Sequence, residues 1–225
     1  MFENAVPALK WDVKRALARA RSRGMARAAA KGGGLPKRLH IGCGGRRVPG
    51  WLNCDVSHSE VNIDLAGGPL PFADGVFEAA CAQHVIEHLS IGGTNGGSGE
   101  LEGLLGEVHR CLMAGGELWL SCPDMHKIAA SYLADGGAAL LADRLSRWPE
   151  SGTAGYPASQ VVNLLFSQWG EHKNLFDLPL LSAVLERCGF GDVEAVDEAR
   201  FLARFPESPP RGDDAISLYV CARRR

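Results

Sequence analysis

The chain has 225 residues, of which 46% are hydrophobic and 22% are charged, and its formal net charge is −2. This composition is typical of one globular domain with a sizeable core. No apolar run approaches the roughly 20 residues that a bilayer-spanning helix needs, which excludes a membrane-embedded protein.

The cysteines point to a reducing compartment. There are seven, an odd number, and no two form a CxxC pair. Several lie inside apolar runs, such as Cys81 in EAACAQ and Cys221 in LYVCA, where a free thiol behaves as a small hydrophobic side chain. The pattern favours free thiols over a disulfide framework. Because no apolar signal-peptide core is found near the start, we expect a cytoplasmic protein.

The first stretch of the chain is strongly basic. Residues 10–31 carry eight Lys or Arg and one acid, a net +7 that leaves −9 for the remainder. Residues 8–30 have a helical pattern, so residues 1–35 are expected to form a basic helix and linker, with Val13 and Leu17 on its buried stripe. Such an arm could also contact nucleic acid or, weakly, a membrane surface. Since it lacks a strong apolar face, we favour a solvated helix.

Residues 36–225 are expected to form one domain in which strands alternate with helices. The predicted strands are 38–41, 51–56, 61–65, 77–82, 117–121, 193–196 and 216–221. The predicted helices are one starting at 84–89, one at 100–112, pieces of a substrate-side insertion at 125–175, and one at 178–188. The glycine-rich segment 92–99 is predicted to be a flexible loop. This alternation predicts an α/β fold with a mostly parallel sheet covered on both faces, whose last two strands could form an antiparallel edge pair.

The first predicted strand runs into a glycine-rich turn, LHIGCGG at residues 39–45. Ligands of open parallel sheets bind at the carboxyl ends of the strands. Gly42 and Gly44 would allow a sharp turn and a close approach of the backbone to a ligand. A dinucleotide fingerprint would need a third glycine at position 47, which is Arg47. Alone, the two glycines fit an ordinary turn equally well.

Two acids follow the next two predicted strands. Asp55 could accept hydrogen bonds from both hydroxyls of a ribose, as an acid does in dinucleotide sites. Asp64 could accept one from the exocyclic amine of an adenine. Either acid alone is more often a turn residue or a helix cap. Both at strand ends after this glycine loop are hard to explain in that way.

Several stretches together resemble the class I S-adenosylmethionine-dependent methyltransferases. They are LHIGCGG, WLNCDV, IDLAGGPLPFADGVFEAACAQHVIEHL and LLGEVHRCLMAGGELWLSCPD, and with SQWGEHKNLFDLPLLSAVLERCGF the resemblance spans roughly residues 36–222. The chain looks most like a short, methyltransferase-11-like subfamily that is often linked to surface-glycan or natural-product pathways. The resemblance implies a Rossmann-like fold with an antiparallel C-terminal edge. It also implies S-adenosyl-L-methionine as cofactor, whose lack of phosphates suits acidic rather than basic contacts.

The resemblance also assigns roles by position. Gly42, Cys43 and Gly44 would line the methionine part of the cofactor, Asp55 the ribose, Asp64 with Leu65 the adenine, and Gln83 with His84 the sulfonium. Two departures stand out. The family usually has an acid at the position of His40, so a neutral or cationic ring replaces an anion beside the loop. Only about eleven residues separate the loop from Asp55, too few for a full crossover helix.

A rival motif follows the predicted fourth strand. The segment from His84 to His88 matches H-x-x-E-H, in which the two histidines would bind zinc from one helix face and Glu87 would act as general base. The third ligand is unidentified, and the motif would open a helix directly after a buried strand. We therefore keep a zinc hydrolase as the weaker alternative and expect no metal.

Methyl transfer is an in-line displacement that depends mainly on positioning, and a hydroxyl acceptor also needs a base. The expected acceptor is a sugar or small hydroxylated metabolite. His172, with its near-neutral intrinsic pKa, and Asp124, at the end of the fifth strand, are the chosen base candidates. His84, His126 and Glu171 are further candidates. Asp124 could instead cap a helix, and His172 could be a surface residue.

Other side chains and functions stay open. Trp148, Tyr156 and Trp169 could form a stacking wall for the acceptor or could simply pack. Segments 92–99 and 150–160 could act as lids. The protein could also bind the cofactor without transferring methyl. A nucleic-acid methyltransferase is disfavoured by the acidic core and by the absence of an NPPY-type motif.

Overall fold

The computed structural model describes residues 13, 16–17, 34–66, 68–92, 98–149, 153 and 155–225. Most of the predicted extension 1–35, most of the predicted loop 92–99 and part of the expected lid 150–160 therefore lie outside the described residues. Val13 and Leu17 are described, and they are 50% and 51% exposed. The expectation that they lie on a buried stripe is wrong, because neither packs against a core cluster of the described residues.

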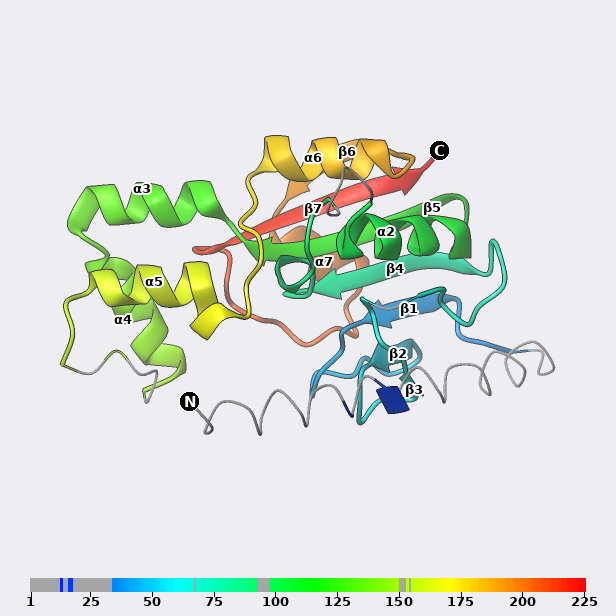
Figure 1. The fold of residues 1–225 in the computed structure, drawn as a ribbon, viewed down its shortest axis with the longest axis horizontal. Coiled ribbons are helices and arrows are strands. Elements are labelled where there is room, and N and C mark those ends of the chain that lie inside the picture. The colour runs from blue at the N-terminus through cyan, green and yellow to red at the C-terminus, as the bar shows by residue number, and fades with distance from the viewer. Residues whose placement is uncertain are drawn as a thin grey trace.

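A seven-stranded sheet forms the centre of the molecule, in the order β3-β2-β1-β4-β5-β7-β6 (Figure 1). The strands are β1 (Arg38–Ile41), β2 (Leu52–Asp55), β3 (Val61–Asn62), β4 (Phe77–Gln83), β5 (Leu112–Pro123), β6 (Phe190–Val196) and β7 (Ser217–Arg224). Strand β7 is antiparallel to both of its neighbours, β5 and β6. The pairings β1–β2, β1–β4, β2–β3 and β4–β5 are all parallel. The predicted mostly parallel sheet with an antiparallel C-terminal pair is confirmed. However, β7 lies inside the sheet and β6 forms its edge.

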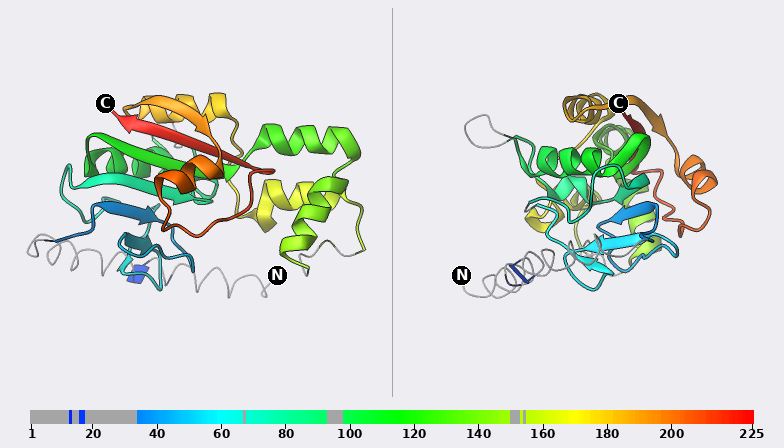
Figure 2. Two further views of the ribbon diagram at one scale, coloured as in Figure 1. Left: turned by 180° about the vertical axis from the view of Figure 1, so that it is seen from behind. Right: turned by 90° about the vertical axis from the view of Figure 1, so that its right-hand side faces the viewer.

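Two core clusters fill the two faces of the sheet, since successive side chains of a strand point to opposite faces. In β4, Ala80 and Ala82 belong to one cluster, and Ala79 and Cys81 to the other. Helices α2 (Glu100–Cys111) and α6 (Leu178–Arg187) cover the first face through their apolar stripes. Helix α7 (Glu198–Arg204), which the sequence pattern does not predict, covers the second face through Phe201 (Figure 2).

A lobe of three helices lies beyond the carboxyl end of β5 (Figure 1). It comprises α3 (Met125–Asp135), α4 (Ala138–Arg147) and α5 (Ser159–Ser167), followed by the 3-10 turn η3 (Gln168–Gly170). The lobe has its own small core, which contains Ile128, Leu140, Val161, Leu165 and Ile216. The predicted helical pieces are thus present, and they stand at the edge of the sheet where ligands of such folds bind. None of the described helices is long and apolar enough to cross a membrane.

The predicted helix starting at 84–89 is wrong. The chain forms a single 3-10 turn there, η1 (Ile86–His88), and then becomes extended. The physical reason is a competing tertiary contact. The carbonyl of Glu87 accepts the backbone amides of Lys173 and Asn174, at 2.8 and 3.2 Å, and is therefore not part of a continuing helix.

Candidate functional site

The glycine turn after β1 requires glycine at two positions. Gly42 and Gly44 have φ values of 66° and 52°, in the left-handed region that side-chain-bearing residues rarely adopt. A Cβ on Gly42 would also lie 2.3 Å from Cγ2 of Val85. The backbone of Gly42 therefore packs directly against Val85 at the carboxyl end of the sheet.

Asp55, at the end of β2, holds the turn in place. One of its carboxylate oxygens accepts the amide of Gly44 at 2.7 Å and the other accepts the amide of Val56 at 2.6 Å. A carboxylate has about four acceptor positions, so these bonds leave capacity for a ligand. The contact also shows how β1 connects to β2 without a crossover helix.

Asn53 also stabilises the connection between β1 and β2. Its side chain exchanges hydrogen bonds with the backbone of Val48 and donates to the carbonyl of Trp51. His40, the residue that departs from the family pattern, is buried with Nδ1 3.2 Å from Oδ1 of Asn53. Burial lowers the pKa of His40 despite this contact. The ring is therefore neutral near pH 7, and it supports the connection rather than a ligand.

A cavity of about 530 Å³ opens at this edge of the sheet. Five of the eight predicted cofactor residues line it: Gly42, Asp55, Asp64, Leu65 and His84. Its other described lining residues are Val56, Ala66, Val85, His88, Leu89, Gln168, Gly170, Glu171 and Lys173. The predicted set is thus largely brought together around one space.

The other three predicted cofactor residues are not among those that line the cavity. Cys43 is buried beneath the loop, with its thiol 3.6 Å from the carbonyl of Gly44. Gly44 contributes indirectly through Asp55. Gln83 ends β4 half-buried, and its Nε2 has no hydrogen-bond partner in the described part of the chain.

A second cavity, of about 340 Å³, adjoins the first. His84, His88 and Gln168 line both of them. The remaining lining residues of the second cavity are Pro123, Arg144, Arg147, Trp148, Leu164, Leu165, Trp169, His172, Arg211, Asp213 and Ile216. Two of the three aromatic candidates, Trp148 and Trp169, therefore face this space, whereas Tyr156 is not among its described lining residues.

His84 stands at the junction of the two cavities in a strained backbone conformation, with φ at 56°. Its Nε2 lies 2.9 Å from the Asp213 carboxylate and 3.0 Å from the Ser217 hydroxyl, and its Nδ1 lies 3.3 Å from Glu87. Burial by itself lowers the pKa of His84, but the two carboxylates outweigh burial and raise it. Asp213 was not anticipated from the sequence. Its only signal is the segment RGDD before the last strand.

Asp213 is buried among donors. Besides His84, it accepts from the hydroxyl of Tyr219 at 2.6 Å and from the guanidinium of Arg211 at 2.9 Å. Burial would raise the pKa of its carboxyl, but these three donors hold it well below its usual range. The Asp213 side chain is therefore a fixed anion behind His84.

His172, one of the two base candidates, lines the second cavity. Its Nδ1 lies 3.0 Å from the carbonyl of Leu165, while Nε2 is buried without a hydrogen-bond partner among the described residues. Burial lowers the pKa of His172, although nearby Glu87 opposes this. If Nδ1 carries the proton that the carbonyl accepts, Nε2 presents a lone pair.

Asp124, the other base candidate, caps a helix. Its carboxylate accepts the amides of His126 and Lys127 at the start of α3, at 2.9 and 3.3 Å. It is buried and is not among the described residues that line either cavity. The geometry therefore favours the capping interpretation of Asp124.

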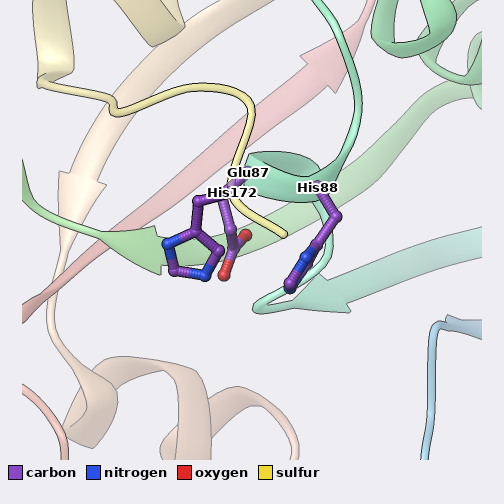
Figure 3. A group of neighbouring side chains, drawn as sticks. All are labelled: Glu87, His88 and His172. Atoms are coloured by element: carbon purple, nitrogen blue, oxygen red, sulfur yellow. The ribbon is translucent and has the colours of Figure 1, made fainter. Parts of the chain in front are cut away.

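The side chains of Glu87, His88 and His172 lie close together (Figure 3). The rings of His88 and His172 are 4.9 Å apart. The zinc pair expected from H-x-x-E-H is not formed. A single 3-10 turn does not align His84 with His88, and both ring nitrogens of His84 already face carboxylates. The sequence did not link His172 to Glu87 and His88, because only the fold brings these segments together.

The order and directions of the seven strands are those of the Rossmann-like class I methyltransferase fold that the motifs led us to expect. No protein-family model matches the chain, and no curated protein matches it.

Several solved structures are similar to it. A possible histamine N-methyltransferase from Thermotoga maritima is 14% identical with a TM-score of 0.44, covering 100% of this chain and 98% of that one. An S-adenosylmethionine-dependent methyltransferase from Mesorhizobium loti is 18% identical with a TM-score of 0.44, covering 89% and 96%. The CMeT domain of the citrinin polyketide synthase is 12% identical with a TM-score of 0.47 and covers 84% of this chain. This chain spans only 46% of that last structure.

Proposed function

We propose that this protein is an S-adenosylmethionine-dependent methyltransferase that methylates a hydroxyl of a small acceptor, a sugar or hydroxylated metabolite that also carries an acidic group. The observation that carries the proposal is the pair of adjoining cavities with His84 and His88 in both. One cavity has Gly42 of the glycine turn and three acids, Asp55, Asp64 and Glu171, in its wall, and the other has arginines and tryptophans. A donor and an acceptor could thus meet at the shared wall.

The residues of the larger cavity suit this cofactor. Asp55 and Asp64 are acceptors for hydroxyl and amine groups, and Gly42 lines the same space with no side chain of its own. Lys173 is the one lysine or arginine among the described lining residues of this cavity. It is paired with Glu100 at 2.5 Å. When bound, S-adenosylmethionine supplies a methyl group on a positively charged sulfur, which an acceptor atom can displace.

The arginines of the smaller cavity favour an acidic acceptor. Arg147 pairs with Asp143, and Arg211 pairs with Asp213. Arg144 has no carboxylate partner among the described residues, and its guanidinium lies 4.5 Å from the centre of the Trp148 ring. Burial lowers the pKa of Arg144, and the neighbouring Arg147 lowers it further. An anionic group on the acceptor would offset this cost.

The acceptor hydroxyl must also lose its proton. In the simplest form of the reaction His172 accepts this proton, since the lowered pKa of its ring keeps the ring neutral near pH 7. His84, held between two carboxylates, then positions the acceptor rather than accepting a proton.

Calorimetric titration with S-adenosylmethionine tests the cofactor assignment. We expect Asp55→Ala and Asp64→Ala to weaken binding roughly 10- to 100-fold, the value of a hydrogen bond to a charged group. Asp74→Asn is the matched control, because Asp74 is an exposed acid that pairs with Arg110. Absence of binding to the unmodified protein, or equal binding by all three variants, would overturn the assignment.

A labelled-methyl transfer screen tests the acceptor class. It compares acidic sugars and hydroxy acids with neutral sugars and with RNA. We expect label in the acidic compounds. Cofactor binding without transfer to any compound would instead identify a non-catalytic binding protein of the same fold, and label in RNA alone would replace the small-molecule proposal.

A further inference from the structure

We propose that Glu87, His88 and His172 bind one divalent transition-metal ion, with Zn²⁺ as the best match, between the two cavities. The ion would hold and activate the oxygen of the methyl acceptor. The proposed site rests on the geometry and burial of these three side chains, whereas the role of the ion rests on the proposed methyl transfer.

The three ligand atoms already surround a common point. One carboxylate oxygen and one nitrogen of each ring lie within 4.8 Å of one another (Figure 3). A point therefore exists within about 2.8 Å of all three, which is 4.8 Å divided by √3. Zinc bonds to imidazole nitrogen and carboxylate oxygen are about 2.0–2.2 Å. Each side chain needs to approach by less than about 1 Å, which small rotations provide.

His84 compensates the buried carboxylate of Glu87 only in part. The Glu87 side chain is 1% exposed, and neither carboxylate oxygen has a hydrogen-bond donor among the described residues. The 3.3 Å approach of His84 Nδ1 reaches one of these oxygens and leaves the other without a partner. A buried carboxylate is costly unless it is paired or coordinates a metal. A metal ion in contact with Glu87 would remove this cost.

Both histidines are oriented as metal ligands usually are. Nδ1 of His172 lies 3.0 Å from the carbonyl of Leu165, and Nδ1 of His88 lies 3.3 Å from the carbonyl of Glu171. Metal-binding histidines generally donate their second ring N–H to a carbonyl or carboxylate, which fixes the tautomer. Here that leaves Nε2 of each ring as the coordinating atom. Nε2 of His172 is one of the buried atoms without a partner in the described chain.

The backbone holds the two ligand-bearing segments together. The amides of Lys173 and Asn174 both donate to the carbonyl of Glu87, and the Asn174 side chain donates to the carbonyl of Leu89. A bound ion would therefore join the end of β4 to the helical lobe at an existing contact.

Two imidazoles and one carboxylate are typical of catalytic zinc, in which three protein ligands leave a position open. His88 and His172 both line the acceptor cavity, so the open position can face the acceptor. A hydroxyl bound there would lose its proton to water more readily, because the metal lowers its pKa. The new O–C bond then forms as the S–C bond breaks, and the electron pair of the broken bond stays on sulfur. In this form of the reaction His172 is a ligand and not the base.

The test is direct metal binding by the full chain after removal of metals with a chelator. Zn²⁺ is titrated by calorimetry, and Co²⁺ is titrated by visible absorption as a spectroscopic probe of the ligand set. We expect one equivalent to bind. Glu87→Gln, His88→Ala and His172→Ala should each weaken binding at least about tenfold. His58→Asn, which removes an exposed histidine elsewhere, should bind as the unmodified chain does.

Failure to bind one equivalent of either ion, or unchanged binding in the three ligand variants, would overturn the proposal. Circular dichroism shows whether each variant folds. If Glu87→Gln does not fold, the metal affinity of His172→Ala still tests the proposal. Calorimetry with S-adenosylmethionine in the presence of chelator separates the two proposals. Cofactor binding without metal binding would overturn only the proposed metal site. Metal binding without cofactor binding would overturn only the proposed methyltransferase function.

Discussion

Nε2 of His84 lies 2.9 Å from the carboxylate of Asp213, a contact between residues 129 positions apart. It joins the end of β4 to the segment before β7, at the wall that the two cavities share. Because the Asp213 carboxylate also accepts from Arg211 and Tyr219, one buried anion orients three side chains.

Asp213→Asn is expected to destabilise the protein by about 3–5 kcal/mol, because it removes the anion from a buried set of charged partners. Urea unfolding followed by circular dichroism measures the change. Asp74→Asn, at an exposed ion pair, should cost less than about 1 kcal/mol. Similar losses in the two variants would contradict the role given to Asp213.

Gly42→Ala should damage the glycine turn, whereas Gly45→Ala should not. Alanine at Gly42 meets Val85 at 2.3 Å and must adopt a φ of 66°, which costs roughly 1–2 kcal/mol before the clash is counted. A Cβ on Gly45 meets no described atom within 4 Å. Thermal unfolding and cofactor titration compare the two variants. The double variant Gly42→Ala, Val85→Ala should recover only part of the loss, since the backbone strain persists.

Arg144→Gln should raise the KM for an acidic acceptor at least about tenfold, the value of one charge-assisted hydrogen bond. Its affinity for the cofactor should not change, because Arg144 lines only the smaller cavity. Arg187→Gln, at an exposed position on α6, is the matched control. An unchanged KM for acidic acceptors would show that Arg144 does not bind the acidic group.

Cys43 should react slowly with iodoacetamide although it lies in the glycine turn. Burial, and after it the Asp55 carboxylate, raises the pKa of its thiol to about 11. Since the thiolate is the nucleophile, alkylation of Cys43 should keep rising with pH beyond about pH 10, where the reaction of an ordinary thiol levels off. Peptide mass spectrometry over time measures each cysteine. Half-buried Cys188 should react first, and faster labelling of Cys43 would contradict the buried position of its side chain.

The strands were largely predictable because their pattern is local. The apolar runs that follow turn residues located β1 and β4 nearly to the residue. The same reasoning failed after β4. The predicted helix would need the carbonyl of Glu87, which accepts hydrogen bonds from Lys173 and Asn174 instead. A contact between distant segments leaves no local trace in the sequence.

The residues of the candidate site were likewise predictable only where the sequence signal is local. Gly42, Asp55 and Asp64 were found because a strand end and a turn mark each of them. The partners of His84 were not found, since Asp213 and Glu87 are ordinary acids until the fold places them against one ring.

By itself, the sequence determined the α/β class, the glycine turn and the two acids at the strand ends, because strand alternation and glycine backbone freedom are properties of neighbouring residues. Only the tertiary structure decided which groups face one another across the cavities. It made Asp124 a helix cap, and it brought His172 to Glu87 and His88. These outcomes depend on burial and on contacts between segments far apart in the chain, and sequence spacing encodes neither.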